Sequence, residues 1–197
     1  MVRLFVAVEL PDEARERLLA MRPANLPSVR LVGRQEMHLT LHFVGEVEND
    51  HILVVRRALE KVKTPPFVVD VEGVGRFPEE GVPRVLWAGV RTSRRLLALY
   101  RAVGTTLAAA VGYGPEDRPY RPHVTLARLD EAPSQEDVEE YLEKHSGFQM
   151  AAIPITRFSL YSSVRIREGP RYELQATFDL SEAAMAAKDN QGPAGSG

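Results

Sequence analysis

The 197-residue sequence contains no cysteine. This absence excludes a disulfide framework, a thiolate nucleophile and every zinc or iron–sulfur site that uses cysteine ligands. The sequence also lacks an excess of charge of either sign, because its formal net charge is only −2. A large basic face that coats a long polyanion is therefore not expected, whereas a local site for one phosphate is compatible with this charge.

Long hydrophobic runs are absent as well. No stretch approaches the roughly 20 apolar residues that span a bilayer. The apolar run Leu4–Val8 is too short for the hydrophobic region of a signal peptide. With neither a membrane span nor a targeting segment, we expect a cytoplasmic protein.

The hydrophobic patterns that are present predict an α+β protein. In the first half they predict strands over 3–10, 37–45 and 66–77, and helices over 11–22 and 49–63. In the second half they predict strands over 83–90 and 123–129, helices over 93–111 and 134–145, and further strands between 148 and 180. Residues 181–197 contain no aromatic or β-branched residue, which predicts a mobile tail.

The two halves share motifs in the same order. The tetrapeptide HLTL at 38–41 recurs as HVTL at 123–126, and the pair Arg-Phe at 76–77 recurs at 157–158. A period of about 85 residues is too long for a solenoid repeat. It predicts a duplicated α+β unit, in which two pseudo-symmetric lobes of mainly antiparallel sheet with flanking helices face a central cleft. We expect residues 1–180 to form this single bilobal domain.

Strand geometry gives the repeated motif a chemical meaning. Side chains alternate between the two faces of a strand, so His38 and Thr40 share one face, as do His123 and Thr125. If the lobes face each other, two imidazoles and two hydroxyls meet in one cleft. One imidazole can act as a base and the other as an acid near neutral pH, while the hydroxyls donate hydrogen bonds to phosphate oxygens. Such a site suits in-line displacement at a phosphodiester with no metal or cofactor.

The segments that carry these residues resemble a known family. HLTLHFVG (38–45) and RPHVTLAR (121–128), with PRVLWAGV between them and GPRYEL near the end, are similar to the two-histidine (2H) phosphoesterases. Among these they most resemble the LigT-like RNA 2′,3′-cyclic phosphodiesterases. The resemblance extends over residues 1–180. It implies a bilobal α+β fold and the metal-independent hydrolysis of an RNA 2′,3′-cyclic phosphate end to a 2′-phosphomonoester.

The resemblance also implies a role for each motif residue. His38 would be the proton donor to the leaving 3′-oxygen, and His123 would be the proton acceptor that activates water. Thr40 and Thr125 would bind the phosphate oxygens. The residues themselves identify the pair of histidines, but they do not assign the acid and the base.

Two further positions match the family's extended pattern. Phe43 and Arg128 each follow a motif histidine by five residues, and the resemblance implies that they contact the substrate. Strand parity argues against both, because an odd offset places a side chain on the opposite face unless the strand contains a bulge. Packing in the core for Phe43 and a surface ion pair for Arg128 are the alternatives. By the same parity, His42 should share the face of His38.

Other functions remain open at this point. The same site could cleave 2′–5′ linkages, or ligate 2′,3′-cyclic and 5′-hydroxyl ends in the reverse direction. An RNA- or nucleotide-binding module without turnover is an alternative of a different class. In each case the expected partner is RNA with a 2′,3′-cyclic phosphate end or a small cyclic nucleotide. Because a pseudo-symmetric chain completes its own cleft, we expect a monomer.

Overall fold

The computed structural model describes residues 1–114, 119–130, 134–166 and 169–181. Its first half contains β1 (Val2–Glu9), α1 (Asp12–Ala20), β2 (Val29–Leu31), the 3₁₀ helix η1 (Arg34–Glu36), β3 (His38–Val47), α2 (His51–Leu59) and β4 (Phe67–Phe77). Its second half contains β5 (Val85–Val90), α3 (Arg94–Val111), β6 (His123–Leu129), α4 (Gln135–His145), β7 (Gln149–Ile155), β8 (Arg157–Ile166) and β9 (Gly169–Asp179). The predicted tail lies outside the described residues, apart from Ser181.

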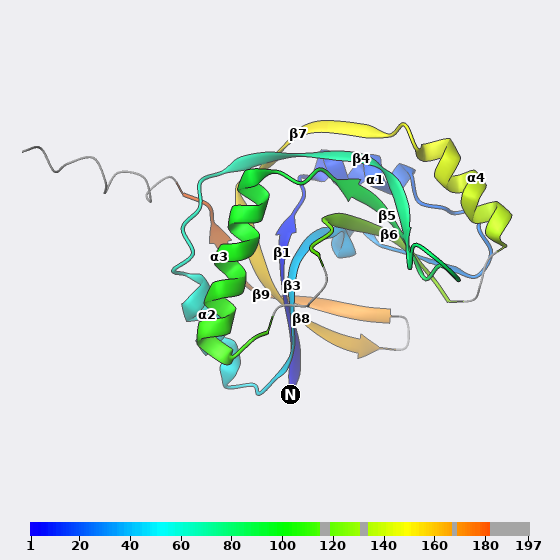
Figure 1. Ribbon diagram of the computed structural model, residues 1–197. Coiled ribbons are helices and arrows are strands. Elements are labelled where there is room, and N and C mark those ends of the chain that lie inside the picture. Colours follow the sequence, from blue (N-terminus) through cyan, green and yellow to red (C-terminus); the bar gives the residue numbers. More distant parts are fainter. Residues whose placement is uncertain (115–118, 131–133, 167–168, 182–197) are drawn as a thin grey trace, which may run out of the picture.

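The described strands form one antiparallel sheet with the order β7-β4-β5-β6-β3-β1-β8-β9, and β2 pairs with β6. This arrangement confirms the predicted α+β class with a large antiparallel sheet and flanking helices. The two strands that begin with the motif histidines, β3 and β6, are neighbours at the centre of the sheet. They share only the pair Leu39–Val124, and the two half-sheets diverge on either side of them (Figure 1).

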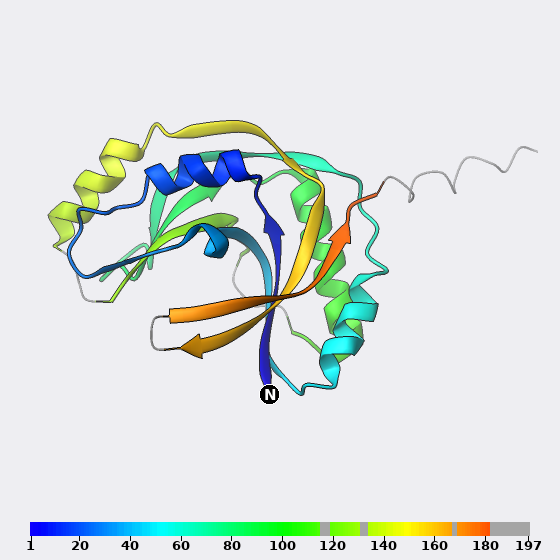
Figure 2. The same ribbon diagram turned by 180° about the vertical axis from the view of Figure 1, so that it is seen from behind.

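The two sequence repeats do not coincide with the two half-sheets. β4 belongs to the first repeat but pairs with β5 of the second, and β8 belongs to the second repeat but pairs with β1 of the first. The helices cross over in the same way. α3 packs beside α2 and against β3, whereas α1 and α4 lie together over the other half-sheet (Figures 1 and 2), where the Tyr141 hydroxyl donates to the Met21 carbonyl at 3.0 Å. Each half of the molecule therefore contains elements of both repeats.

Serine side chains begin two of the predicted helices. Ser93 Oγ accepts a hydrogen bond from the Leu96 amide at 3.1 Å, and Ser134 Oγ accepts one from the Asp137 amide at 3.0 Å. Each bond satisfies an amide that has no partner within its helix. Among the described residues, no helix is both long and apolar enough to cross a membrane.

Helix α3 approaches β3 closely at Gly104. A Cβ atom at this position would lie 2.9 Å from Cε1 of His42, and the His42 side chain is buried there with Nε2 donating to the Tyr100 carbonyl at 2.7 Å. Glycine at residue 104 therefore allows the helix to lie directly on the imidazole.

We predict that Gly104→Ala lowers the free energy of unfolding by about 1–3 kcal/mol, because the added methyl group overpacks this contact. Helix propensity alone predicts the opposite sign, since alanine is favoured over glycine by about 1 kcal/mol in a helix. Urea denaturation followed by circular dichroism measures the change. Thr105→Ala, on the exposed side of the same turn, is the matched control and should be neutral or slightly stabilising. A gain in stability for Gly104→Ala would contradict the prediction.

Candidate active site

A β-bulge interrupts β3 within its H-x-T-L motif. Thr40 pairs with Ala7 of β1, but the preceding residue of β1, Val6, pairs with His42. Leu41 is therefore an extra residue with no partner of its own. Beyond a bulge of this kind the side chains of the strand exchange faces.

Strand β6 contains a bulge at the equivalent position. Thr125 pairs with Trp87 of β5, and Ala127 pairs with Leu86, so that Leu126 is the extra residue. The final leucine of each H-x-T-L motif is thus the bulged residue. The two motifs therefore share an irregular backbone as well as their side chains.

The two bulges correct the expectations from strand parity. Phe43 and Arg128, at odd offsets, line the same cavity as His38, and Phe43 is 57% exposed rather than packed in the core. The prediction that His42 shares the face of His38 is wrong, because His42 is buried against α3. The error has one physical cause, which is the extra residue between the histidine and the later positions.

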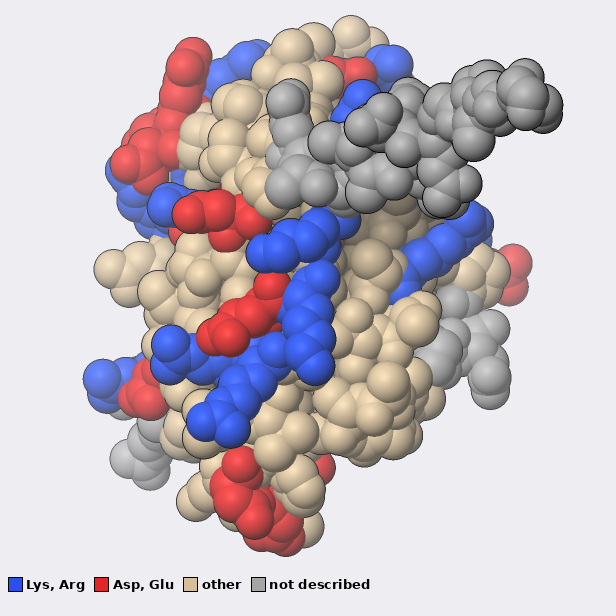
Figure 3. Space-filling model, turned by 90° about the vertical axis from the view of Figure 1, so that its left-hand side faces the viewer, with Lys and Arg blue, Asp and Glu red and all other residues tan. Residues whose placement is uncertain are grey.

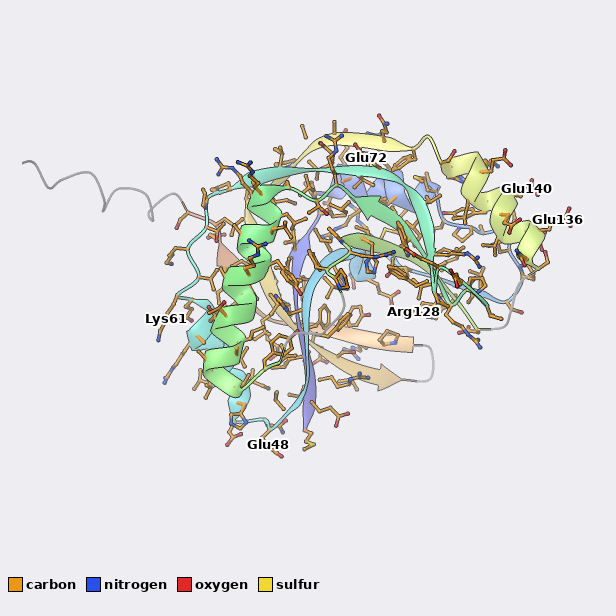
Figure 4. The ribbon with its side chains drawn as sticks, in the orientation of Figure 1. Glu48, Lys61, Glu72, Arg128, Glu136 and Glu140 are labelled. Carbon is orange, nitrogen blue, oxygen red and sulfur yellow. The ribbon has the colours of Figure 1, made fainter. Side chains whose placement is uncertain are left out.

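The two motifs line one cavity of about 200 Å³. Its walls include all six residues that the sequence singled out: His38, Thr40, Phe43, His123, Thr125 and Arg128. Arg30, Phe77 and Tyr172 also line it; none of these was predicted as a site residue, although Phe77 belongs to the repeated Arg-Phe pair. In Figure 4, Arg128 lies below β5 and β6, on the side of the β8–β9 hairpin. The structure therefore brings the predicted site residues together in one place.

His123 hydrogen-bonds to the backbone two residues before it, where Nδ1 donates to the Arg121 carbonyl at 2.7 Å. The backbone of Glu36, two residues before His38, favours the protonated form of the His38 ring and raises its pKa against the larger effect of burial. The bond of His123 selects the tautomer in which the neutral ring carries its lone pair on Nε2. This nitrogen of His123 can therefore accept a proton.

Aromatic rings enclose both imidazoles. The His38 ring stacks on Phe5, with centroids 5.0 Å apart, and contacts Tyr172 edge-on at 5.4 Å. The His123 ring meets Phe77 edge-on at 4.9 Å. These rings restrict the orientation of the imidazoles and displace water from them.

Enclosure changes the proton affinity of both histidines. Burial lowers the pKa of His38 from 6.5 to about 4, and the positive charge of Arg128 lowers it as well. Burial also lowers the pKa of His123, and Arg128 acts on it in the same direction. Both imidazoles are therefore neutral at pH 7 in the ligand-free protein. A bound anion would oppose both effects, because a nearby negative charge favours the protonated ring.

Two arginines line the cavity, and their partners differ. Arg30, which pairs with Arg128 across β2 and β6, forms an ion pair with Glu36 at 3.1 Å. Arg128 instead lies beside the phenol of Tyr172, which is neutral. Arg128 is therefore the cation best placed to bind an anion in this cavity.

A second, larger cavity of about 540 Å³ adjoins the first. The two cavities share Thr40, Phe43, Phe77 and His123. The walls of the larger one add Tyr100, Tyr113 and Tyr120, together with the ion pair between Glu79 and Arg121. A ligand whose phosphate lies in the smaller cavity has room to extend into an aromatic one.

The charges outside these cavities are mixed. Figure 3 shows Lys and Arg side chains on the face that carries α2 and α3, interspersed with Asp and Glu. The pair formed by Arg56 of α2 and Glu60, the residue after this helix, is one example, at 3.6 Å. Across the part of the chain that the structure describes, no group of three or more His, Asp or Glu side chains is arranged to hold a metal ion.

Comparison with known proteins extends over nearly the whole fold. Residues 10–167 match the 2′-5′ RNA ligase superfamily. An RNA 2′,3′-cyclic phosphodiesterase of Archaeoglobus fulgidus is 30% identical over 180 residues, which are 90% of this chain and 100% of the relative.

Solved structures agree with this match. The protein TT0787 of Thermus thermophilus superposes with a TM-score of 0.75 and 27% identity, over 90% of this chain and 97% of its own. Escherichia coli LigT in complex with 3′-AMP gives a TM-score of 0.71 and 28% identity, over 92% of this chain and 99% of its own. The chain therefore belongs to the 2′-5′ RNA ligase superfamily.

Proposed function

We propose that this chain is a metal-independent RNA 2′,3′-cyclic phosphodiesterase that converts cyclic phosphate ends to 2′-phosphomonoesters. The observation that carries the proposal is the single cavity lined by both H-x-T motifs and Arg128. The name of the relative from Archaeoglobus fulgidus supports the same reaction. Membership of the superfamily is also compatible with ligation. The proposal of hydrolysis therefore has to be argued from the residues of the cavity.

In the proposed reaction His123 is the proton acceptor. Its neutral ring, held by the Arg121 carbonyl, takes a proton from water through Nε2 as the water oxygen attacks phosphorus. A lowered pKa keeps this ring unprotonated over most of the pH range, as a general base requires.

His38 is the proposed proton donor. As the bond from phosphorus to the 3′-oxygen breaks, His38 gives its proton to that oxygen, and the products are a 3′-hydroxyl and a 2′-phosphomonoester. His38 then lacks one proton and His123 holds one more, so exchange with solvent restores both rings. The negative charge of the bound phosphate favours protonation of His38 before the reaction begins.

The remaining cavity residues would bind the substrate. Thr40 and Thr125 donate hydrogen bonds to the non-bridging oxygens, and Arg128 supplies positive charge where charge develops in the transition state. Phe43, an exposed aromatic side chain at the junction of the two cavities, would contact the nucleoside. We also propose that residues 1–180 act as one monomeric domain in the cytoplasm, on RNA ends or small cyclic nucleotides.

Ligation is the second candidate function. The superfamily takes its name from 2′-5′ RNA ligation, and a 5′-hydroxyl could replace water at the same site. Supplying an oligonucleotide with a 5′-hydroxyl together with the cyclic-phosphate substrate, and separating the products, distinguishes a 2′–5′ linkage from a 2′-phosphomonoester.

We expect His38→Ala and His123→Ala each to lower kcat/KM on a 2′,3′-cyclic phosphate oligonucleotide by about 10²–10⁴-fold, the contribution of a positioned acid or base. His51→Ala is the matched control, since this histidine lies half-exposed on α2, and it should keep wild-type activity. Undiminished turnover by either motif variant would reject the assigned roles.

Turnover should also be unchanged after dialysis against excess EDTA, because the proposed steps use only protein groups and water. The measurement is the initial rate before and after chelation, with Mn²⁺, Mg²⁺ or Zn²⁺ added back in separate assays. Loss of activity on chelation and recovery with one of these metals would contradict the metal-independent mechanism.

The pH dependence follows from the two lowered pKa values. The rate falls at low pH as His123 becomes protonated and at high pH as His38 loses its proton, so kcat/KM should peak below the ordinary histidine value of 6.5. Arg128→Gln removes a charge that lowers both pKa values, and it should move both limbs of the profile to higher pH while reducing the maximum. Arg56→Gln, on the exposed surface of α2, is the control. Limbs that stay in place or move to lower pH in Arg128→Gln would contradict this electrostatic account.

A further inference from the structure

The ladder between the two motif strands does not extend from Val124 to the neighbouring residue His123. Leu39 pairs with Val124, and Pro122 stands one residue before His123. Proline has no amide hydrogen to extend an antiparallel ladder, and the Pro122 carbonyl accepts from the Val90 amide of β5 at 3.0 Å. Thr40, the residue of β3 after the paired Leu39, therefore lies where the two strands begin to separate.

A tyrosine side chain reaches across this separation. The Tyr120 hydroxyl donates to the Thr40 carbonyl at 3.0 Å. Thr40 is also the last residue before the bulge at Leu41. The hydrogen bond therefore restrains the backbone at the point where β3 changes the direction of its later side chains, including Phe43.

Tyr120 is itself firmly held. Its ring stacks on Tyr100 of α3, with centroids 4.0 Å apart and planes 16° apart. Burial raises the pKa of the Tyr120 phenol far above its ordinary value, so the hydroxyl keeps its proton throughout the range in which an enzyme of this kind is assayed. The donor is therefore constant in position and in charge.

The second motif has a different restraint. At its bulge, the Leu126 carbonyl accepts a hydrogen bond from the backbone amide of Val32 at 3.0 Å. A backbone hydrogen bond thus restrains the bulge of β6, whereas a hydrogen bond from a side chain restrains β3 next to its bulge. The restraint on β3 depends on a side chain, so a conservative side-chain substitution can remove it without changing the backbone.

From this geometry we propose that Tyr120 is a positioning residue that acts through Thr40. By holding the Thr40 carbonyl, it sets the position of the hydroxyl that binds a phosphate oxygen. Tyr120 lies three residues before His123, so one short segment carries the proton acceptor and fixes the phosphate-binding residue of the other motif. The inference rests on the proposed function, because it assigns Thr40 to phosphate binding.

The test is a double-mutant cycle that combines Tyr120→Phe with Thr40→Ala. Tyr120→Phe keeps the stacked ring and removes only the donor, and we expect it to lower kcat/KM about tenfold, mainly through kcat, since small displacements of positioning groups have effects of at least this size. In the Thr40→Ala background the same substitution should change kcat/KM less than about twofold, because the group that it positions is absent. In the Thr125→Ala background the full effect should persist.

Tyr113→Phe is the matched control. It removes a phenol from the same cavity, but this phenol bonds to His42 at 3.2 Å rather than to Thr40, so its effect should be the same in the presence and absence of the Thr40 hydroxyl. All assays are run well below the melting temperatures of the variants, which are measured separately. A merely structural role for Tyr120 predicts equal losses in all three backgrounds, and that result would overturn the inference, as would wild-type kcat/KM for Tyr120→Phe.

The same cycle, measured as affinity for 2′-AMP by calorimetry, does not require turnover. Tyr120→Phe should weaken binding when Thr40 is present and leave it unchanged in Thr40→Ala. Coupling in the affinity without any hydrolysis by the wild type would reject the proposed function and keep the role of Tyr120. Hydrolysis without coupling in either measurement would reject the role of Tyr120 alone.

Discussion

One backbone pair, Leu39 with Val124, is the contact on which the candidate site depends. In an antiparallel register this pair places the residue before Leu39 across from the residue after Val124. The side chains of His38, Thr40, His123 and Thr125 therefore lie around this one pair and line the same cavity. A slip of either strand by one residue would direct the histidine of that strand into the apolar core.

The bulges extend this arrangement beyond the two paired motifs. An unbroken strand would place a third cavity residue only at an even offset from the histidine. The extra residues Leu41 and Leu126 let Phe43 and Arg128 join the cavity, and they turn His42 and Ala127 into the interior. Each half-sheet needs strands from both repeats, because β4 pairs with β5 and β8 pairs with β1. This pairing keeps the two bulged strands, β3 and β6, in one sheet.

The sequence allowed the order of the longer helices and strands and the two H-x-T pairs to be predicted, because each depends on local pattern. The short elements β2 and η1 were not predicted. The bulges could not be predicted, since a leucine in a strand carries no signal of irregular pairing. Phe5 and Tyr172 were missed for another reason: they reach His38 from strands far apart in the chain. The pairing of β4 with β5 and of β8 with β1 was not predicted either, because it depends on tertiary contacts that the pattern within each repeat does not specify.

The near-neutral charge of the chain is consistent with the electrostatics of the cavity. Arg30 is neutralised by Glu36, which leaves the charge of Arg128 to act on two buried imidazoles. Without an anion, this charge and burial keep both rings neutral. In the proposed mechanism a bound phosphate would make the two rings differ, because its charge would favour a proton on His38 while its geometry would direct water to His123. The substrate would thus supply the asymmetry between two motifs that are alike in sequence.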